Sequence, residues 1–271
     1  MAIARDKFWI FGVRAHQDDG RIGVNRHERK HYQLFRSRIT PTEAAHMLDV
    51  PNMLLINCDG EPAPFSEEAY GYAESFCRLD KVFWGACGSN GFRTGNEPEF
   101  ICKLAEEYPN ICGAFLDDLF VCSDDAEGVL KSVREGLSKS EKNLEMYVTW
   151  YPQKEKGEGV EALINKYIDG ISIWTWDSKD LINLEKVFET AEKTFPGKKL
   201  FLGIYMFDFF NGRPLTDEQM EYQCELGLKW LKEGRLAGMI FEANSVMGVK
   251  FPSEKWLRKW IDKVKFTEVA D

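Results

Sequence analysis

The sequence has no apolar run near the roughly 20 residues that a membrane-spanning helix needs. It also has no excess of positive charge: the formal net charge is -9, and no basic stripe accompanies a nucleic-acid-binding motif. The first 17 residues do not resemble a signal peptide, because their apolar stretch is short and is interrupted by Arg14. We therefore expect neither a membrane nor nucleic acid as a partner, and a cytoplasmic location.

Paired metal-binding cysteines are missing as well. The seven cysteines include no CxxC pair, and several fall in apolar runs such as LLINC and NICGAF. They are typical of buried free thiols in a reducing compartment, and no zinc or iron–sulfur site is indicated. No P-loop and no GxGxxG fingerprint occurs, so no nucleotide cofactor is expected. We predict no cofactor and no bound metal.

The sequence does contain a regular alternation of strand and helix patterns. Short apolar runs rich in β-forming residues begin near residues 7, 52, 81, 111, 144, 170, 199 and 238. Amphipathic segments lie between them, two of them opened by capping boxes at Thr40–Glu43 and Thr216–Gln219. Eight strands alternating with eight helices predict an α/β fold, a single (β/α)8 TIM barrel over residues 1–271. A doubly wound open sheet is the alternative.

The segment after the first strand, residues 16–39, is longer than an ordinary barrel loop. From Arg14 to Arg38 the chain carries seven basic and three acidic residues, and it holds three of the four histidines, at 16, 27 and 31. This segment is either a solvent-exposed loop without a binding role or a lid over the barrel mouth that helps to bind an oxygen-rich or anionic ligand.

Barrel enzymes place their chemistry at the C-terminal ends of the strands. Polar and aromatic residues stand there in this chain: His16, Asp59, Asp117, Asp118, Trp150, Trp176, Asp177, Asp208, Glu242 and Asn244. Strand alternation predicts that Gly12, Arg14 and His16 face the lumen while Phe11 and Val13 face the helices. By the same argument Asn57, Asp59, Glu242 and Asn244 face the lumen, with Ile56 and Phe241 outside.

Several of these residues have structural alternatives. Asp177 directly precedes a helical pattern and could cap that helix. Glu242 and Arg14 lie on neighbouring strands of a closed barrel and could form an ion pair in the lumen. His16 could be a core histidine, and Asp59 could belong to a turn.

Two adjacent carboxylates, Asp117 and Asp118, end the fourth run, GAFLDDLF. The next helix is expected to begin near Ser123 or Asp124, which is too distant for either aspartate to cap it. Only one of the two can follow the lumen parity of the strand, and the alternation does not say which.

Large rings cluster near the ends of strands five to seven. They are Trp150, Tyr151, Trp174, Trp176, Tyr205, Phe209 and Phe210, of which Trp174 is expected in the core. Rings beside carboxylates suit a carbohydrate, whose C–H faces stack on them while its hydroxyls form hydrogen bonds. The predicted partner is a small carbohydrate, bound by Arg14, His16, Asp59, Trp150, Trp176, Asp177, Tyr205 and Asn244.

The run GAFLDD resembles the fourth strand of barrel glycoside hydrolases, which ends in one or two aspartates after a small and apolar lead-in. No motif of a single glycosidase family is matched: some relatives have Glu–Pro or Asn–Glu where this chain has Asp–Asp. The resemblance implies that Asp117 or Asp118 acts as acid/base or nucleophile. The second carboxylate is Glu242 or Asp208, and Asp177 is a third position that some relatives use.

Two other functions remain open. The first is a sugar isomerase, epimerase or lyase that holds Mg²⁺ or Mn²⁺ through Asp59, Asp118, Asp208, Glu242 and His16. The second is a barrel that binds a sugar without turnover. The sequence does not decide the sugar, the anomeric outcome or the oligomeric state.

Overall fold

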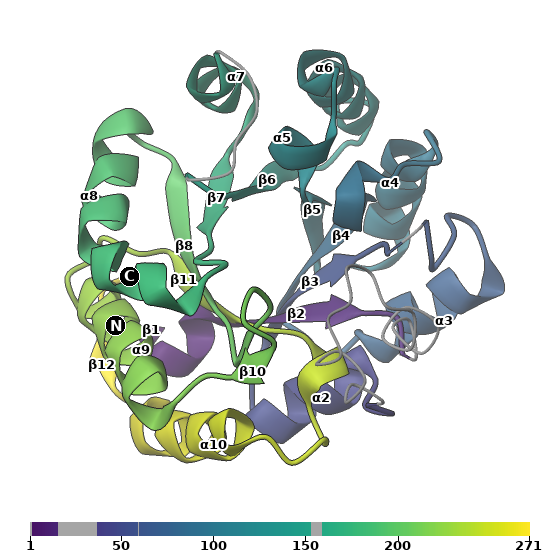
Figure 1. The fold of residues 1–271 in the computed structure, drawn as a ribbon. Helices are drawn as coiled ribbons and strands as arrows, with labels where there is room; N and C mark the ends of the chain where they lie inside the picture. The colour runs from purple at the N-terminus through teal and green to yellow at the C-terminus, as the bar shows by residue number, and fades with distance from the viewer. Residues whose placement is uncertain (1, 16–36, 59, 153–158) are drawn as a thin grey trace.

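Eight parallel strands close into a barrel in the order β11-β2-β3-β4-β5-β6-β7-β8, and helices surround it (Figure 1). The computed structural model describes residues 2–15, 37–58, 60–152 and 159–271. The barrel strands are β2 (Phe8–Val13), β3 (Asn52–Ile56), β4 (Lys81–Cys87), β5 (Ile111–Leu116), β6 (Glu145–Trp150), β7 (Gly170–Ile173), β8 (Lys199–Ile204) and β11 (Gly238–Phe241). Each begins within one residue of its predicted start, so the predicted TIM barrel is confirmed.

Helices follow every barrel strand. They are α2 (Pro41–Leu48), α3 (Glu67–Ser75), α4 (Glu97–Glu107), α5 (Leu119–Cys122), α6 (Ala126–Leu137), α7 (Val160–Tyr167), α8 (Leu184–Thr194), α9 (Asp217–Lys232) and α10 (Pro252–Val264). Short 3-10 turns precede or join them: η1 (Ala4–Lys7), η3 (Ser89–Gly91), η4 (Ser178–Asn183) and η5 (Asn244–Val246). The short helix α5, directly after β5, was not predicted.

Both predicted capping boxes are present. The Thr40 hydroxyl accepts the Glu43 amide at 3.2 Å, and the Glu43 carboxylate accepts the Thr40 amide at 2.8 Å. Thr216 and Gln219 make the same exchange at the start of α9. These bonds satisfy N–H groups that a helix start otherwise leaves without partners, which is why the two starts could be predicted from sequence.

Two small antiparallel pairs complete the fold. Strand β1 (Ala2–Ile3) pairs with β12 (Glu268–Val269), which brings the two ends of the chain together (Figure 1). Strands β9 (Phe207–Asp208) and β10 (Arg213–Pro214) form a hairpin after β8. No helix in the described ranges is long and apolar enough to cross a bilayer. No disulfide links any two of the seven cysteines, all of which lie in the described ranges, and Cys58, Cys87 and Cys224 are buried.

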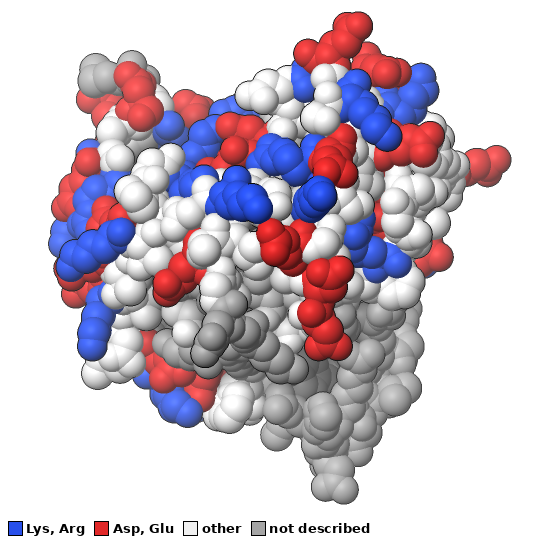
Figure 2. Space-filling model, turned by 90° about the horizontal axis from the view of Figure 1, so that it is seen from above, with Lys and Arg blue, Asp and Glu red and all other residues white. Residues whose placement is uncertain are grey.

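Charge is mixed over the face of the barrel seen in Figure 2. Among the residues coloured in this view, basic and acidic side chains lie intermixed.

The first barrel strand has the opposite parity from the predicted one. The Phe11 ring lies inside the barrel, 6.1 Å from the Phe115 ring and 5.5 Å from the Trp174 ring. A Cβ atom on Gly12 would instead lie 3.1 Å from Met53 and from Pro41 of α2. The prediction was wrong because rings fill this part of the lumen, while the small Gly12 lets α2 approach the strand closely.

Candidate active site

A cavity of about 240 Å³ lies at the C-terminal mouth of the barrel. Among the described residues three carboxylates reach it, namely Asp117, Asp118 and Glu242. The other described residues that line it are aromatic, small or weakly polar: Phe11, Val13, Cys58, Ser89, Tyr151, Trp174, Trp176, Tyr205, Phe209, Ala243 and Ser245. Carboxylates beside a partly apolar wall are the arrangement expected of a binding site for a small polar ligand.

Asp117 is held from both neighbouring strands. It lies one residue past β5 and is only 5% exposed, and its amide donates to the Cys87 carbonyl of β4 at 2.8 Å. Its Oδ1 accepts the Thr149 hydroxyl of β6 at 2.9 Å, and its Oδ2 accepts the Ser89 hydroxyl of η3 at 3.3 Å. The carboxyl group is therefore fixed in one orientation at the cavity.

Asp118 reaches the same cavity because the backbone changes direction. Its φ of 51° and ψ of 13° are left-handed, so the alternation of the strand ends at Asp117. Phe115 lies in the lumen beside Phe11, which makes Asp117 the member of the pair with lumen parity. Asp118 precedes helix α5, yet its side chain makes no capping hydrogen bond.

The pKa of Asp117 is raised well above that of an ordinary aspartate. Burial is the main cause, because it disfavours the charged carboxylate, and the nearby Asp118 charge adds to it. The hydroxyl donors Thr149 and Ser89 lower the pKa but do not cancel the rise. Asp117 therefore keeps its proton to a higher pH than an exposed aspartate would.

This raised pKa predicts a pH dependence of stability. The folded state holds the Asp117 proton above the pH at which the unfolded chain releases it. The protonated Asp117 therefore contributes its full share of the free energy of unfolding below the ordinary aspartate pKa of about 3.9. This share is lost as the pH rises through the folded-state pKa of Asp117. Asp117→Asn should remove this decline, which urea unfolding at a series of pH values would detect. Identical pH slopes in the two proteins would contradict the assignment.

Glu242 follows β11 and is anchored by the backbone of the loop after β8. Its Oε2 accepts the amides of Met206 at 2.7 Å and Phe207 at 2.9 Å, and the residue is only 3% exposed. Phe241, before it, packs outward against Phe8 and Trp260. The parity predicted for this strand is confirmed at these two residues.

One wall of the cavity is aromatic. The rings of Trp176 and Phe209 are stacked with centroids 5.5 Å apart, and Tyr205 lies edge-on to both. The phenol oxygens of Tyr151 and Tyr205 are 3.2 Å apart. Burial is the first cause of the raised pKa of both tyrosines, and neighbouring carboxylates add to it, so both phenols stay protonated.

Two predicted carboxylates lie beside the cavity but do not line it. The Asp208 carboxylate accepts the amide of Asn211 at 2.8 Å and its side-chain Nδ2 at 2.7 Å, within a turn. Asp177 caps η4 through the Lys179 amide and pairs with the Lys179 ammonium at 2.6 Å. The capping alternative for Asp177 is thus confirmed, and Asn211 connects the two aspartates.

The other predicted residues that the structure describes do not line the cavity either. Arg14 pairs with Glu68 at 2.7 Å, and the alternative of an ion pair between Arg14 and Glu242 is not confirmed. Trp150 packs on Phe195 of the helix layer, with ring centroids 5.1 Å apart. On the second strand Cys58 reaches the cavity and Asn57 does not line it. His16, Asp59 and the predicted lid up to residue 36 lie outside the described residues.

Asn244 holds the chain on both sides of the long loop. Its Oδ1 accepts the Val13 amide at 2.8 Å, and its Nδ2 donates to the Ile39 carbonyl at 2.7 Å. Ser37 adds bonds from its hydroxyl to the carbonyls of Asn244 and Met247. The side-chain amide thus joins the last residue of β2 to the approach to α2.

Asn244→Ala should lower the free energy of unfolding by about 1–3 kcal/mol. The residue is 1% exposed, and its loss would leave the Val13 amide without its acceptor and the Ile39 carbonyl without its donor. Urea unfolding would measure the change. Asn165→Ala is the matched control, because Asn165 makes one exposed side-chain bond, and its effect should stay within about 0.5 kcal/mol. Equal effects of the two substitutions would contradict the role of Asn244.

The sequence interpretation did not include Thr149 or Ser89 among the site residues. Thr149 is a buried hydroxyl on an otherwise apolar strand end, and Val148 pairs in register with Leu116. That register places Thr149 beside Asp117. The role of Thr149 can therefore be recognised only once the strand pairing is known, and not from the sequence alone. Among the described residues no group of three His, Cys, Asp or Glu side chains could hold a metal ion.

Comparison with solved structures finds the same fold in enzymes that act on carbohydrates. A GH18 chitinase from Pseudoalteromonas aurantia has a TM-score of 0.54 at 13% identity, covering 95% of this chain and 99% of its own. A GH99 endo-alpha-mannosidase from Bacteroides thetaiotaomicron has a TM-score of 0.56 at 11% identity, covering 96% and 97%. The second catalytic domain of a group II chitinase from Ostrinia furnacalis has a TM-score of 0.58 at 10% identity, covering 98% of each chain.

No protein-family model and no curated protein sequence matches the chain. At 10–13% identity the structural likeness concerns the fold alone. The chain therefore has a TIM-barrel fold like that of glycoside hydrolases, as the resemblance of its fourth strand implied.

Proposed function

We propose that this protein is a glycoside hydrolase whose general acid is Asp117. The observation that carries the proposal is a buried carboxyl group of raised pKa, fixed at a mouth cavity that two further carboxylates share. A general acid must hold its proton at the working pH, and burial gives Asp117 that property. The fold shared with chitinases and a mannosidase supports a carbohydrate as the substrate class.

The neighbouring residues suit the other steps of such a reaction. The Asp117 proton passes to the glycosidic oxygen as the bond to the anomeric carbon breaks. The carboxylate left behind is stabilised by the Thr149 and Ser89 hydroxyls that already point at it. As that bond breaks, Glu242 acts as the second carboxylate in one of two ways. It attacks the anomeric carbon and forms a glycosyl ester, which water then hydrolyses with the Asp117 carboxylate as the base, or it takes a proton from the water that attacks the anomeric carbon directly. The Trp176–Phe209 wall offers a ring face for stacking.

Hydrolysis assays on a panel of aryl glycosides and β- and α-linked oligosaccharides would test the proposal. The wild-type protein should release a sugar from at least one of them, and Asp117→Asn and Asp118→Asn should each be assayed on that substrate. If neither substitution lowers the activity at least tenfold, the assignment to this pair is wrong. Release of no sugar, together with calorimetric binding of one, would favour the non-catalytic alternative.

A chelator separates the metal-dependent alternative from this proposal. Hydrolysis by carboxylates should be indifferent to EDTA, since it needs no Lewis acid. Loss of activity in EDTA and its return with Mg²⁺ or Mn²⁺ would support the isomerase or lyase alternative.

A further inference from the structure

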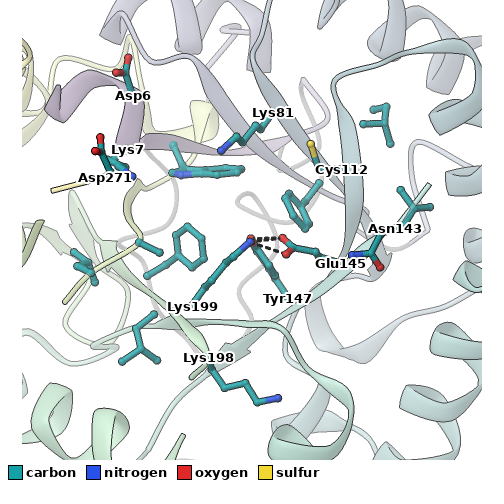
Figure 3. A pocket seen from close by; sticks show the side chains of 18 of the residues that line it. Asp6, Lys7, Lys81, Cys112, Asn143, Glu145, Tyr147, Lys198, Lys199 and Asp271 are labelled. Carbon is teal, nitrogen blue, oxygen red and sulfur yellow. Dashed lines mark hydrogen bonds and ion pairs between the residues drawn. The ribbon is translucent and has the colours of Figure 1, made fainter. Parts of the chain in front are cut away.

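A second and larger hollow lies at the opposite end of the barrel. It measures about 660 Å³ and is formed where the strands begin, by residues that include Lys81 of β4, Glu145 of β6 and Lys199 of β8 (Figure 3). Its floor is the lowest ring layer of the barrel, made by Trp9, Phe83, Tyr147 and Phe201 of alternate strands. The residues proposed for hydrolysis take no part in it.

Positive charge gathers around this hollow. Of the residues that the structure describes, six basic side chains line it, namely Lys7, Lys81, Lys142, Lys198, Lys199 and Arg235. Three acidic side chains of the same ranges line it, namely Asp6, Glu145 and Asp271, so the local difference among them is +3 (six minus three) in a chain of net charge -9. An acidic protein has enough carboxylates to pair with all its lysines, so an excess of positive charge at one hollow is unexpected.

Four of the six cations form no ion pair with a carboxylate of the described residues. Arg235 pairs with Glu192 and Glu233, and Lys199 pairs with Glu145. Within the part of the chain that the structure describes, no ion pair reaches the ammonium groups of the other lysines, Lys7, Lys81, Lys142 and Lys198. The Lys142 and Lys198 ammonium groups donate hydrogen bonds to the backbone carbonyls of Tyr108 and Asn165, respectively.

Two ammonium groups point into the middle of the hollow. Figure 3 shows Lys81 and Lys199 extending inward from opposite sides of the barrel. Lys199 reaches Glu145 at 2.6 and 2.8 Å across β7, whose first residue, Gly170, has no side chain to separate them. Glu145 also accepts the Tyr147 hydroxyl at 2.8 Å. Lys81 is exposed, and no carboxylate in the described ranges forms an ion pair with it.

We propose that this hollow binds a compact polyanion of the polyphosphate class. Several separate ammonium groups match a ligand that carries three or more negative charges along a short chain, because lysine binds phosphate oxygens as a point charge. The four floor rings are at most 4% exposed, so they offer little stacking area, and recognition rests on charge. The site is independent of the proposed hydrolysis.

Glu145 is the internal competitor for such a ligand. The Glu145 carboxylate forms an ion pair with the Lys199 ammonium group, and its negative charge repels an incoming anion. Glu145→Gln should therefore increase the affinity for a polyanion, whereas loss of Lys7 and Lys81 should decrease it. Opposite effects of these neighbouring changes are specific to an anion site.

Calorimetric titration of the full chain with sodium tripolyphosphate tests the proposal. We expect saturable binding, at least tenfold weaker affinity in Lys7→Gln/Lys81→Gln, and several-fold tighter affinity in Glu145→Gln. Lys131→Gln is the control, because Lys131 lies on α6 and pairs with Glu135. This variant should bind tripolyphosphate as the wild type does. Asp117→Asn should also bind normally, whatever its effect on hydrolysis.

Thermal unfolding gives an independent reading, since a ligand that binds only the folded state raises the unfolding temperature. Tripolyphosphate should raise it more than sodium chloride of equal ionic strength. Equal affinity for tripolyphosphate and a nucleoside triphosphate would support recognition of the phosphate chain. No binding of tripolyphosphate, an equal effect of sodium chloride, or unchanged affinity in the lysine variant would overturn the proposal.

Discussion

Asp117→Asn should lower kcat/KM for a glycoside with a poor leaving group by at least about 100-fold, the lower end of what general acid catalysis contributes. Asparagine keeps the shape of the side chain: its Oδ1 can accept from Thr149, and its Nδ2 can donate to the Ser89 hydroxyl, but it has no acidic proton to donate. Because the group is buried and its pKa is raised, the substitution replaces a protonated carboxyl by a neutral amide, and the fold should persist.

The dependence on the leaving group separates a general acid from a residue that only binds substrate. Glycosides whose leaving group needs no proton, such as a dinitrophenolate, should lose much less activity in Asp117→Asn. Asp208→Asn is the matched control: it is the same chemical change at a residue only 2% exposed that lies outside the cavity lining. An equal loss on all leaving groups, or a larger loss in Asp208→Asn, would contradict the role of Asp117.

Glu242→Gln is the second substitution with a large expected effect, again at least about 100-fold in kcat/KM. Glutamine can still accept the amides of Met206 and Phe207 through its oxygen, so the loop after β8 should keep its position. The negative charge would be lost, and with it the ability to attack the anomeric carbon or to activate water. Steady-state kinetics on the substrate found in the panel would measure the loss.

Glu97→Gln is the control for Glu242. Glu97 is 2% exposed, and its carboxylate accepts a backbone amide of its own loop, away from the cavity. The activity of the Glu97→Gln variant should therefore stay within a few-fold of the wild type. The anomer first formed by the wild type, read by NMR, then defines the Glu242 role: retention indicates a nucleophile and inversion a general base. Full activity of Glu242→Gln would exclude both roles.

The barrel could be predicted because its signals are local. Each buried strand is a short apolar run, and the capping residues Thr40 and Thr216 mark helix starts through bonds to residues three positions on. The mouth carboxylates could be predicted as well, since Asp117 and Glu242 directly follow β5 and β11. The fold rule places such residues at one end of the barrel.

The local role of each polar residue could not be predicted, because it depends on contacts between distant segments. Asn244 bonds residues more than 200 positions away, and Arg14 pairs with Glu68 of α3. Asp208 belongs to a turn that Asn211 closes. The position of Asp118 depends on a left-handed backbone angle that strand alternation does not describe.

The titration of the Asp117 carboxyl group tests the central claim most directly. Infrared difference spectra of the wild type against Asp117→Asn would follow the C=O stretch of the protonated acid as the pH is raised. The account predicts that this band persists well above the ordinary aspartate pKa of about 3.9 and is absent from the variant. Disappearance of the band at or below that pH would show an ordinary carboxylate and would contradict the assignment of Asp117 as the general acid.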